Sequence, residues 1–331
     1  MPVKLEIKKF VKLFIPYGVI ENKQVIKHFV KLFVPFGIIE YRQKHKEQSW
    51  FMWCKKHPKE LTEKLYFEIF GKHLDWENPR DINEKIHWLK LCSNTTLWSK
   101  LADKYRVRKY VESKGLGHTL NELYFVYHNY RKIDISKLPD SFVMKVNNGS
   151  GDRLIVGDKK GYTNNQIQEH FKTYHHFGVY TAEPHYLKIK PCIIAEKLLV
   201  DKNSPSEYLI DYRFWCFNGE IKFINVHANA GAIVYGTFNE NWELWNVLSH
   251  ENQNVMKAMK PKSFDEMKKI CAILGANIPF VRIDLYEINE QPVFGEMTFS
   301  PGAGFISHYT QEFLNELGSY LKLPKKSHPI V

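Results

Sequence analysis

Two acidic residues near the C-terminus, Asp284 and Glu296, have a spacing that a pair of strands would turn into a facing pair. Residues 280–287 and 292–299 alternate in polarity and are rich in β-branched and aromatic side chains, which predicts a β-hairpin. A three-residue loop at 289–291, which we expect, places the two acids directly opposite each other, whereas a two-residue loop would put them on opposite faces. Facing carboxylates repel unless a cation lies between them, and Mg²⁺ binds one or two carboxylates together with substrate phosphates. The stretch therefore predicts a metal–nucleotide site; the alternative is a solvated strand face with ordinary surface acids.

The period of two in a strand also predicts which side chains accompany each acid. Arg282 shares a face with Asp284, and Phe294 and Thr298 share a face with Glu296. An arginine would therefore lie beside the carboxylates.

A lysine-bearing strand that runs into a small-residue loop is the second candidate. Lys145 lies in the apolar run 141–148, and Asn148, Gly149, Ser150 and Gly151 follow before another strand at 153–156. Such a loop can lie over phosphates, because its backbone N–H groups approach closely while the lysine neutralises charge. The alternative is an ordinary turn, and without a following helix the pattern is no P-loop.

Two further strands carry polar groups that a nucleotide could use. The apolar strand 192–200 reaches Glu196 and Lys197, and backbone groups where it exits can hydrogen-bond the edge of an adenine between the apolar walls of Leu198 and Leu199. Residues 211–227 predict a hairpin with Asn218-Gly219 at its turn. Asp211, Arg213 and Trp215 share one face of it, so Arg213 could reach a phosphate.

The helices that position these strands are expected before residue 120. Asp81 and Glu84 have capping-box spacing, and a single helix is predicted from about Thr95 to Lys114, with Gly115 as its stop. The basic side chains of this second helix are expected on a solvated face: Lys104, Arg106, Arg108 and Lys109.

The composition favours a large enzyme-sized body. With 331 residues, 44% hydrophobic and 15% aromatic, the chain can bury a core of two or three domains. Its five cysteines are scattered without a CxxC pair, which favours a reducing, cytoplasmic compartment. The net charge is +11, of which residues 1–46 hold ten Lys/Arg against three Glu, or +7. The remainder of the chain lacks the basic excess of a nucleic-acid-binding protein, so we expect no nucleic-acid partner.

The basic N-terminus contains an internal repeat. FVKLFIPYGVIE at 10–21 and FVKLFVPFGIIE at 29–40 are identical at nine of twelve positions. Each copy is a basic apolar half-helix that is interrupted by proline and glycine, too short to span a bilayer. A segment lying peripherally on an anionic membrane surface fits this pattern, and so does a helical hairpin packed on the main body.

The ordered parts of the sequence resemble the ATP-grasp superfamily, and more closely its TupA-like branch, which is associated with teichuronopeptide and capsular polysaccharide synthesis. The resemblance runs from about Leu61 to Phe305 and rests on six blocks in family order: FGKHLDWENPRDINEKIHWLKL, LADKYRVRKYV, LPDSFVMKVNNGSG, IIAEKLL, DYRFWCFNGEIKFI and RIDLYEINEQPVFGEMTFSPGAG. It implies an α+β ATP-grasp fold, in which two α+β lobes hold ATP between them, with a helical N-terminal region. The expected divisions are 1–46 (repeat segment), 47–120 (helical region), 121–200 (small lobe), 201–322 (large lobe) and 323–331 (tail).

The resemblance also implies roles for the candidate residues. Phosphate contacts would come from Lys104, Lys145, Arg213 and Arg282, of which the last three would be catalytic; the 148–151 loop would cover the phosphates; and Glu196 with residues 197–199 would hold adenine. Asp284 and Glu296 would bind Mg²⁺, together with Thr298, which stands where many ATP-grasp ligases have asparagine. The implied activity is an ADP-forming ligation of a sugar-acid carboxylate and an amine through an acylphosphate. The alternatives are a phosphoryl- or glycosyltransferase of the same pathway and an inactive ATP-binding module that is recruited to the membrane. Since the chemistry needs no side-chain nucleophile, we expect His227 and His308 to be packed or surface residues.

Overall fold

The computed structural model describes residues 36–149, 153–172, 178–201, 209–229, 233–249 and 259–325. The chain divides into two units, Met1–Lys56 and His57–Val331. In the first unit, α3 (Phe36–Lys56) begins at the residue after Pro35 and runs past position 46. The first copy of the N-terminal repeat and the start of the second lie outside the described residues. Within the described part, no helix combines the length and the apolar character that a membrane crossing needs.

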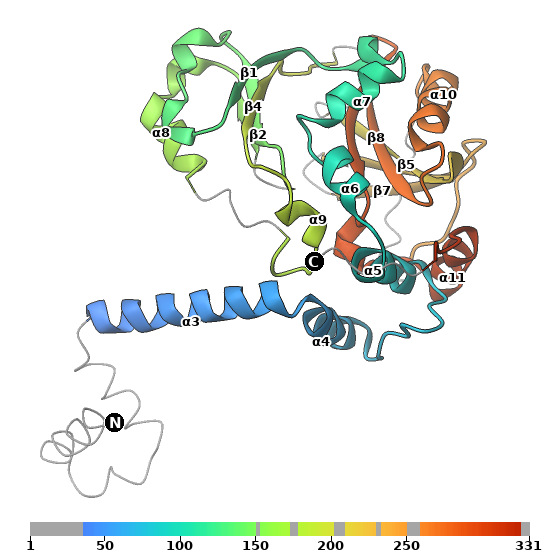
Figure 1. Cartoon of the computed structure of the whole chain (residues 1–331). Helices are drawn as coiled ribbons and strands as arrows, with labels where there is room; N and C mark the ends of the chain where they lie inside the picture. The colour runs from blue at the N-terminus through green and yellow to red at the C-terminus, as the bar shows by residue number, and fades with distance from the viewer. Residues whose placement is uncertain are drawn as a thin grey trace, which may run out of the picture. The chain divides into compact units, whose positions relative to one another are not determined.

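Short helices open the second unit and lead to its first sheet (Figure 1). They are α4 (Pro58–Phe70), α5 (Ile82–Cys92), α6 (Thr96–Leu101), α7 (Val107–Ser113) and the 3₁₀ turn Gly117–Thr119. The capping box that was predicted for α5 is confirmed: Asp81 Oδ1 accepts from the Glu84 N–H at 2.9 Å, and Glu84 Oε2 accepts from the Asp81 N–H at 3.4 Å. Both capping side chains are buried and hydrogen-bonded, so the capping box fixes the residue at which α5 begins.

The single helix expected from Thr95 to Lys114 is wrong, because the chain breaks between α6 and α7. Asp103 causes the break: its Oδ1 accepts from the backbone N–H groups of Tyr105 and Arg106 at 3.0 and 3.1 Å, which starts a new helix. The freed backbone of Lys104 instead donates to the Asn147 carbonyl at 3.0 Å. The break between α6 and α7 therefore connects the helical region to the residue that precedes the small-residue loop 148–151, which we call the glycine-rich loop.

A four-stranded antiparallel sheet carries the expected lysine strand. Its strands are β1 (Leu123–Tyr127), β2 (Phe142–Val146), β3 (Arg153–Val156) and β4 (Ile193–Glu196), in the order β1-β4-β2-β3. One face packs Met144 and Ala195 against Ile167 of α8 (Asn164–His170). Lys145 and Glu196 alternate with these core residues, so their side chains leave the sheet on the other face. The short helix α9 (Pro184–Leu187) precedes β4.

A five-stranded antiparallel sheet carries the two acids. Its strands are β5 (Ile210–Phe217), β6 (Glu220–Asn229), β7 (Ile233–Asn239), β8 (Val281–Ile288) and β9 (Gln291–Thr298), in the order β7-β6-β5-β8-β9. The β5–β6 turn is the predicted Asn218-Gly219, with φ of 52° and 86°. Strand β7 was not predicted from the sequence. Helix α10 (Phe264–Gly275) packs on β5, β6 and β8, and α11 (Gln311–Tyr320) packs on α5.

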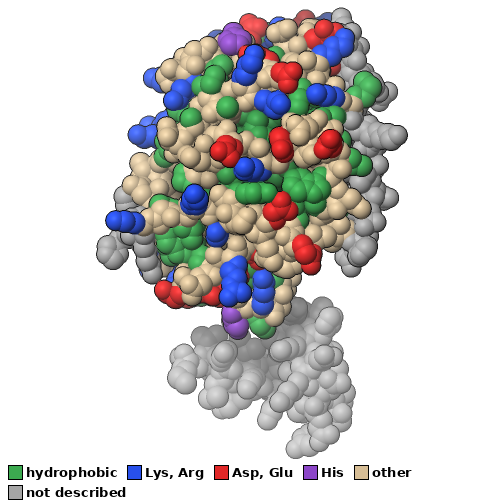
Figure 2. All heavy atoms as spheres, turned by 90° about the vertical axis from the view of Figure 1, so that its right-hand side faces the viewer, with side chains coloured by type: hydrophobic (Ala, Val, Ile, Leu, Met, Phe, Trp, Pro, Cys, Tyr) green, Lys and Arg blue, Asp and Glu red, His purple; other side chains and the backbone are tan. Residues whose placement is uncertain are grey.

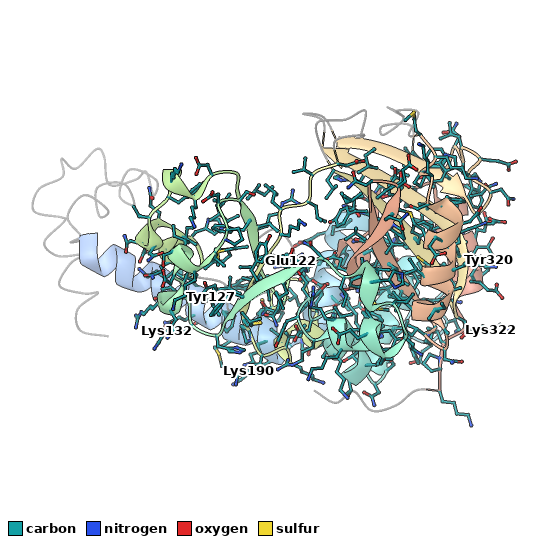
Figure 3. The ribbon with its side chains drawn as sticks, turned by 90° about the horizontal axis from the view of Figure 1, so that it is seen from above. Glu122, Tyr127, Lys132, Lys190, Tyr320 and Lys322 are labelled. Atoms are coloured by element: carbon teal, nitrogen blue, oxygen red, sulfur yellow. The ribbon has the colours of Figure 1, made fainter. Side chains whose placement is uncertain are left out.

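The two sheets lie side by side in the second unit (Figure 1). Figure 3 shows Tyr127 on the side of the four-stranded sheet, whereas Tyr320 and Lys322 lie beyond the five-stranded sheet. On the face that carries α10, basic and acidic side chains are interspersed (Figure 2). The described residues on that face thus present no continuous basic surface of the kind that binds nucleic acid.

The β8–β9 hairpin differs from the prediction in its turn. Its loop has two residues, Asn289 and Glu290, both with positive φ (50° and 65°), so the expected three-residue loop is wrong. Asp284 nevertheless pairs with Glu296, because a β-bulge adds Gly295 to β9 and shifts the register between Asp284 and Leu285. A Cβ on Gly295 would lie 2.8 Å from the Asp284 carbonyl oxygen, which explains why a glycine stands there.

The bulge also overturns a second expectation. Phe294 pairs with Leu285 and belongs to the apolar core, so it lies on the face opposite to Glu296. The hydrophobic side of the hairpin therefore packs inward while both acids stay on the other side.

Candidate active site

One row of polar residues crosses the whole five-stranded sheet. In register from edge to edge it contains Glu296, Asp284, Arg213, Asn225 and Thr237. Residues that pair directly across neighbouring strands have their side chains on one face. We call this set the polar row; it places the two predicted acids beside the predicted arginine of β5.

Asp284 is buried and is held by the neighbouring arginine on its own strand. Arg282 Nε and Nη2 lie 2.7 and 2.6 Å from the two carboxylate oxygens, a bidentate pair. Burial raises the pKa of Asp284, the Arg282 guanidinium opposes this, and the charges of Asp211 and Glu296 add to the increase, so that the pKa reaches about 7. Asp284 is therefore a carboxylate whose charge depends on the cations around it.

Glu296 has the opposite electrostatic balance. Lys104 Nζ lies 2.9 Å from Oε2, Arg282 Nη2 lies 3.4 Å from Oε1, and the Thr298 hydroxyl donates to Oε1 at 3.1 Å. Burial would raise the pKa of Glu296, but Lys104 and Arg282 outweigh it and lower the pKa to about 2. Glu296 is thus fully ionised at neutral pH.

These side chains fit a magnesium–nucleotide complex better than a resident metal ion. In the described part of the chain, no three His, Cys, Asp or Glu side chains gather as a ready-made metal site. Two facing carboxylates and the Thr298 hydroxyl are hard oxygen donors, and phosphate oxygens and waters would complete an octahedral shell. The cations Lys104 and Arg282 neutralise the two carboxylates. The expected ligands Asp284, Glu296 and Thr298 therefore lie together, and their role as metal ligands remains a prediction.

A second charged cluster lies on the four-stranded sheet. Glu196 is buried, and its carboxylate contacts Lys145 Nζ at 2.7 Å and Arg108 Nη1 at 3.2 Å. Arg108 also donates to the Asn121 carbonyl at 2.7 Å. The structure thus brings the predicted Lys145 and Glu196 together and adds Arg108, which the sequence analysis had placed on a solvated helix face.

Arg108 is a functional candidate that sequence reasoning missed. Its side chain is only 16% exposed, because α7 begins after the break and directs this residue at β4. The signal in the sequence is Asp103, a residue that starts helices and that stands in the middle of the expected one. Splitting the helix there would have directed Arg108 inward.

The segment after Glu196 is partly committed to the chain itself. The Lys197 N–H donates to the Glu122 carbonyl at 2.9 Å, and the Lys197 carbonyl accepts from Asn121 Nδ2 at 2.9 Å. The backbone N–H of Lys197 is therefore already bonded within the chain, so it is not available to an adenine edge. Leu198 and Leu199, both half-buried, remain the predicted residues for contacts with an adenine edge and face.

The glycine-rich loop is anchored where it leaves β2. Asn147 Nδ2 donates to Asp103 Oδ1 at 2.9 Å, and Asn147 Oδ1 accepts from the Cys192 N–H at 2.7 Å. The Gly149 carbonyl accepts from Lys104 Nζ at 2.6 Å. Because Lys104 also pairs with Glu296, one ammonium group connects the loop to the acid hairpin. The expected loop residues Ser150 and Gly151 lie outside the described residues.

Arg213 occupies the centre of the polar row. Its Nε and Nη2 each lie 2.8 Å from Asp211 Oδ2, and its Nε lies 3.9 Å from Asp284 Oδ2. Burial alone would lower the pKa of Arg213, but Asp211 and Asp284 raise it above its ordinary value. Arg213 stays charged and is placed between two carboxylates, where an incoming phosphate would find a cation.

Comparison with known proteins gives the following matches. The family model described as TupA-like ATPgrasp matches residues 84–322. Among solved structures, D-alanine–D-alanine ligase from Bacillus anthracis in complex with ATP is 12% identical, over 66% of this chain and 57% of that one, with a TM-score of 0.36. L-amino acid ligase from Bacillus licheniformis is 14% identical, over 63% of this chain and 45% of that one, with a TM-score of 0.40.

The chain thus spans about half the length of these two ligases. No curated protein matches it. The family model, in contrast, covers well over half of the chain and includes most of α5, both sheets and α11. The protein therefore belongs to the TupA-like ATP-grasp family.

Proposed function

We propose that the protein is an ATP-dependent, ADP-forming ligase that joins a carboxylate to an amine. The observation that carries the proposal is the facing pair Asp284 and Glu296, with Lys104, Arg213 and Arg282 around it. These residues come from the strands β5, β8 and β9 and from the turn between α6 and α7. Carboxylates that can share a magnesium ion, next to several fixed cations, form a site for a triphosphate. Family membership supports ATP-dependent carboxylate–amine ligation in general terms.

The reaction needs positioning and charge neutralisation from the protein. A substrate carboxylate oxygen attacks the γ-phosphorus of ATP, which releases ADP and leaves an acylphosphate; an amine then attacks the acyl carbon and phosphate departs. Lys104, Lys145 and Arg213 are the groups that would spread the phosphoryl charge, and Arg282 would orient Asp284. Magnesium held by Asp284 and Glu296, with Thr298 beside them, would supply further neutralisation of the phosphates.

Lys104 has a particular place in this proposal. Its ammonium group neutralises Glu296 and donates to the Gly149 carbonyl. A bound magnesium–nucleotide complex would replace it at Glu296, and the released ammonium group would then lie next to phosphate. Lys104 would thus exchange one anion for another without leaving the site.

We further propose that the carboxylate belongs to a sugar acid of a surface polysaccharide or its precursor, as the resemblance to the TupA-like branch implies. Incubation with ATP, Mg²⁺, candidate uronates and candidate amines, followed by mass analysis of the products, tests this. A gain in mass that corresponds to an amide supports the ligase. A stable phosphorylated product would instead identify a kinase, because the same groups surround the same phosphates in both reactions. Absence of any product with intact ATP binding would favour the inactive module.

The N-terminal segment 1–46 bears on where in the cell the protein acts. Its charge of +7 and its repeated apolar stripes support a peripheral contact with an anionic membrane surface. Such a contact would hold a cytoplasmic enzyme near membrane-bound polysaccharide precursors.

A further inference from the structure

The polar face of the five-stranded sheet continues beyond the groups that the nucleotide would use. On β5 and β6, Asp211 pairs directly with His227, two residues along the strands from the Arg213–Asn225 pair of the polar row. Both residues therefore lie on the face that carries Asp284 and Glu296. Neither is needed for the phosphates or for magnesium, and from the sequence His227 was expected to be a packed or surface residue.

Asp211 has a hydrogen-bond acceptor with no partner. Its Oδ2 accepts from Arg213 at 2.8 Å, whereas its Oδ1 is buried and receives no hydrogen bond from the residues that the structure describes. A buried carboxylate oxygen without a donor is unfavourable unless a ligand or water completes it. Thr237 Oγ1, in the neighbouring polar row, is likewise buried and without a partner in the described part of the chain. Two unfilled positions on one face indicate that this part of the sheet is built for a polar ligand.

The charges around His227 indicate which kind of ligand would bind beside it. Burial lowers the pKa of His227, and the charge of Arg213 lowers it further. The Asp211 carboxylate raises this pKa, but Arg282 and Arg153 add to the decrease. The imidazole is therefore neutral near pH 7 and can accept a proton. For an amine at this place the arginines favour the uncharged, nucleophilic form, whereas the Asp211 carboxylate favours the ammonium form, so the amine needs a proton acceptor beside it.

The position of Asp211 relative to Asp284 fits a binding site for the amine, the second substrate of the proposed ligation. Arg213 Nε lies 2.8 Å from Asp211 and 3.9 Å from Asp284, so one guanidinium group separates Asp211 from the proposed magnesium site. A molecule bound at Asp211 would therefore lie next to the reacting phosphoryl and acyl groups.

We propose that Asp211 and His227 form the amine site: Asp211 Oδ1 accepts a hydrogen bond from the amine nitrogen, and His227 accepts its proton. This inference rests on the proposed function. The ammonium form gives one proton to His227, and the resulting lone pair forms the C–N bond to the acyl carbon while the C–O bond to phosphate breaks. A second proton leaves with phosphate as hydrogen phosphate, and one N–H remains in the amide, so all atoms and charges balance.

Two nucleophiles of similar size test the catalytic part. Methylamine is protonated at neutral pH, whereas hydroxylamine is already uncharged and needs no base. With ATP, Mg²⁺ and a uronate probe such as glucuronate or galacturonate, wild-type protein is expected to form the amide with methylamine and the hydroxamate with hydroxylamine. His227→Gln should lower methylamide formation about 100-fold or more and hydroxamate formation only a few-fold. Asp211→Asn should show the same selective loss with a higher KM for methylamine.

The matched control is Glu220→Gln, which neutralises an exposed acid at the other end of β6. Its two rates should equal those of the wild type. Equal losses for both nucleophiles in His227→Gln would overturn the inference and assign His227 to the first half-reaction or to folding. Unchanged methylamide formation would overturn it as well. A wild type that forms neither ADP nor hydroxamate with any acid would instead refute the proposed ligase, and the amine site with it.

A binding measurement needs no knowledge of the acid. In protein that carries labelled histidine and is saturated with Mg²⁺ and a non-hydrolysable ATP analogue, methylamine should shift the ring signals of His227. Asp211→Asn should abolish this shift, and His73→Gln, which changes an exposed histidine outside the sheet, should not affect it. An unshifted His227 in wild-type protein would overturn the assignment even if ligase activity were found.

Discussion

Substitution of Lys104 by methionine removes an ammonium group that joins the glycine-rich loop to the acid hairpin. Methionine keeps most of the aliphatic chain, so packing changes little, while the 2.9 Å contact with Glu296 and the 2.6 Å bond to Gly149 are lost. The effect on the free energy of unfolding can be estimated from Glu296. Its pKa is about 2 in the folded protein and about 4.3 in an unfolded chain.

A depressed carboxylate pKa stabilises the folded state at pH values above the unfolded pKa. A difference of roughly two pKa units corresponds to about 3 kcal/mol at neutral pH. Lys104 is the largest of the contributions that lower the pKa of Glu296, and Arg282 and Thr298 remain in the variant. We therefore expect Lys104→Met to lower the free energy of unfolding by roughly 2 kcal/mol at about pH 7.5. The difference from wild type should shrink as the pH falls from about 4 toward 2, because Glu296 then becomes protonated in both proteins.

Urea unfolding of both proteins at several pH values measures this difference. Lys100→Met is the matched control, since Lys100 lies exposed in the last turn of α6 and its removal should change stability by less than about 0.5 kcal/mol. A loss of stability that is the same at about pH 7.5 and about pH 3 would refute the electrostatic explanation and show that Lys104 acts through packing alone.

Three other perturbations have defined outcomes. Deletion of residues 1–46 should lower sedimentation with anionic vesicles, each lost lysine contributing about 1 kcal/mol at the surface, and should leave ATP affinity nearly unchanged; equal sedimentation would exclude the membrane contact. Lys145→Ala should weaken ATP binding in calorimetry at least about tenfold with an unchanged circular dichroism spectrum, whereas exposed Lys160→Ala should do neither; an unfolded variant would show that Lys145 is structural. Burial, with Lys90 nearby, lowers the pKa of His185 to about 3. The neutral ring therefore stabilises the fold fully above about pH 6.5, and stability is lost as the pH falls toward 3. His185→Phe should flatten the dependence of urea midpoints on pH in that range, and an unchanged slope would contradict this assignment.

The facing of Asp284 and Glu296 could be predicted because strand periodicity is strong in both runs. The turn between them could not be read correctly, since a two-residue turn and a bulge together give the same pairing as a three-residue loop without one. Periodicity counts residues along a strand and does not show where an extra residue is accommodated. Gly295, a glycine within a strand pattern, was the available signal.

The helical side of the site was less accessible to sequence reasoning. Helix propensity treats Thr95 to Lys114 as continuous, whereas a tertiary bond from Lys104 to Asn147 and the cap from Asp103 divide it. That division decides that Lys104 and Arg108 point inward rather than into solvent. Long-range hydrogen bonds of this kind leave no period in the sequence. The strands around Lys145 and Glu196 could be predicted, because each shows its apolar run and its charged residue within a few positions.

The bulge at Gly295 has a consequence for how this hairpin can change over evolutionary time. A turn with an even number of residues and one bulged residue together set an odd offset between the strands, and only that parity keeps both acids on one side. Loss of Gly295 alone would remove the bulge and leave Glu296 opposite Asp284. Loss of a residue between the turn and Gly295, with the bulge kept, would instead direct either Glu296 or the apolar residues of the strand to the wrong side. A larger side chain at position 295 would meet the Asp284 carbonyl and push against the same arrangement. Strand β9 can therefore lose its bulged residue without separating the acids, but any other single insertion or deletion between the turn and Glu296 would need a compensating one.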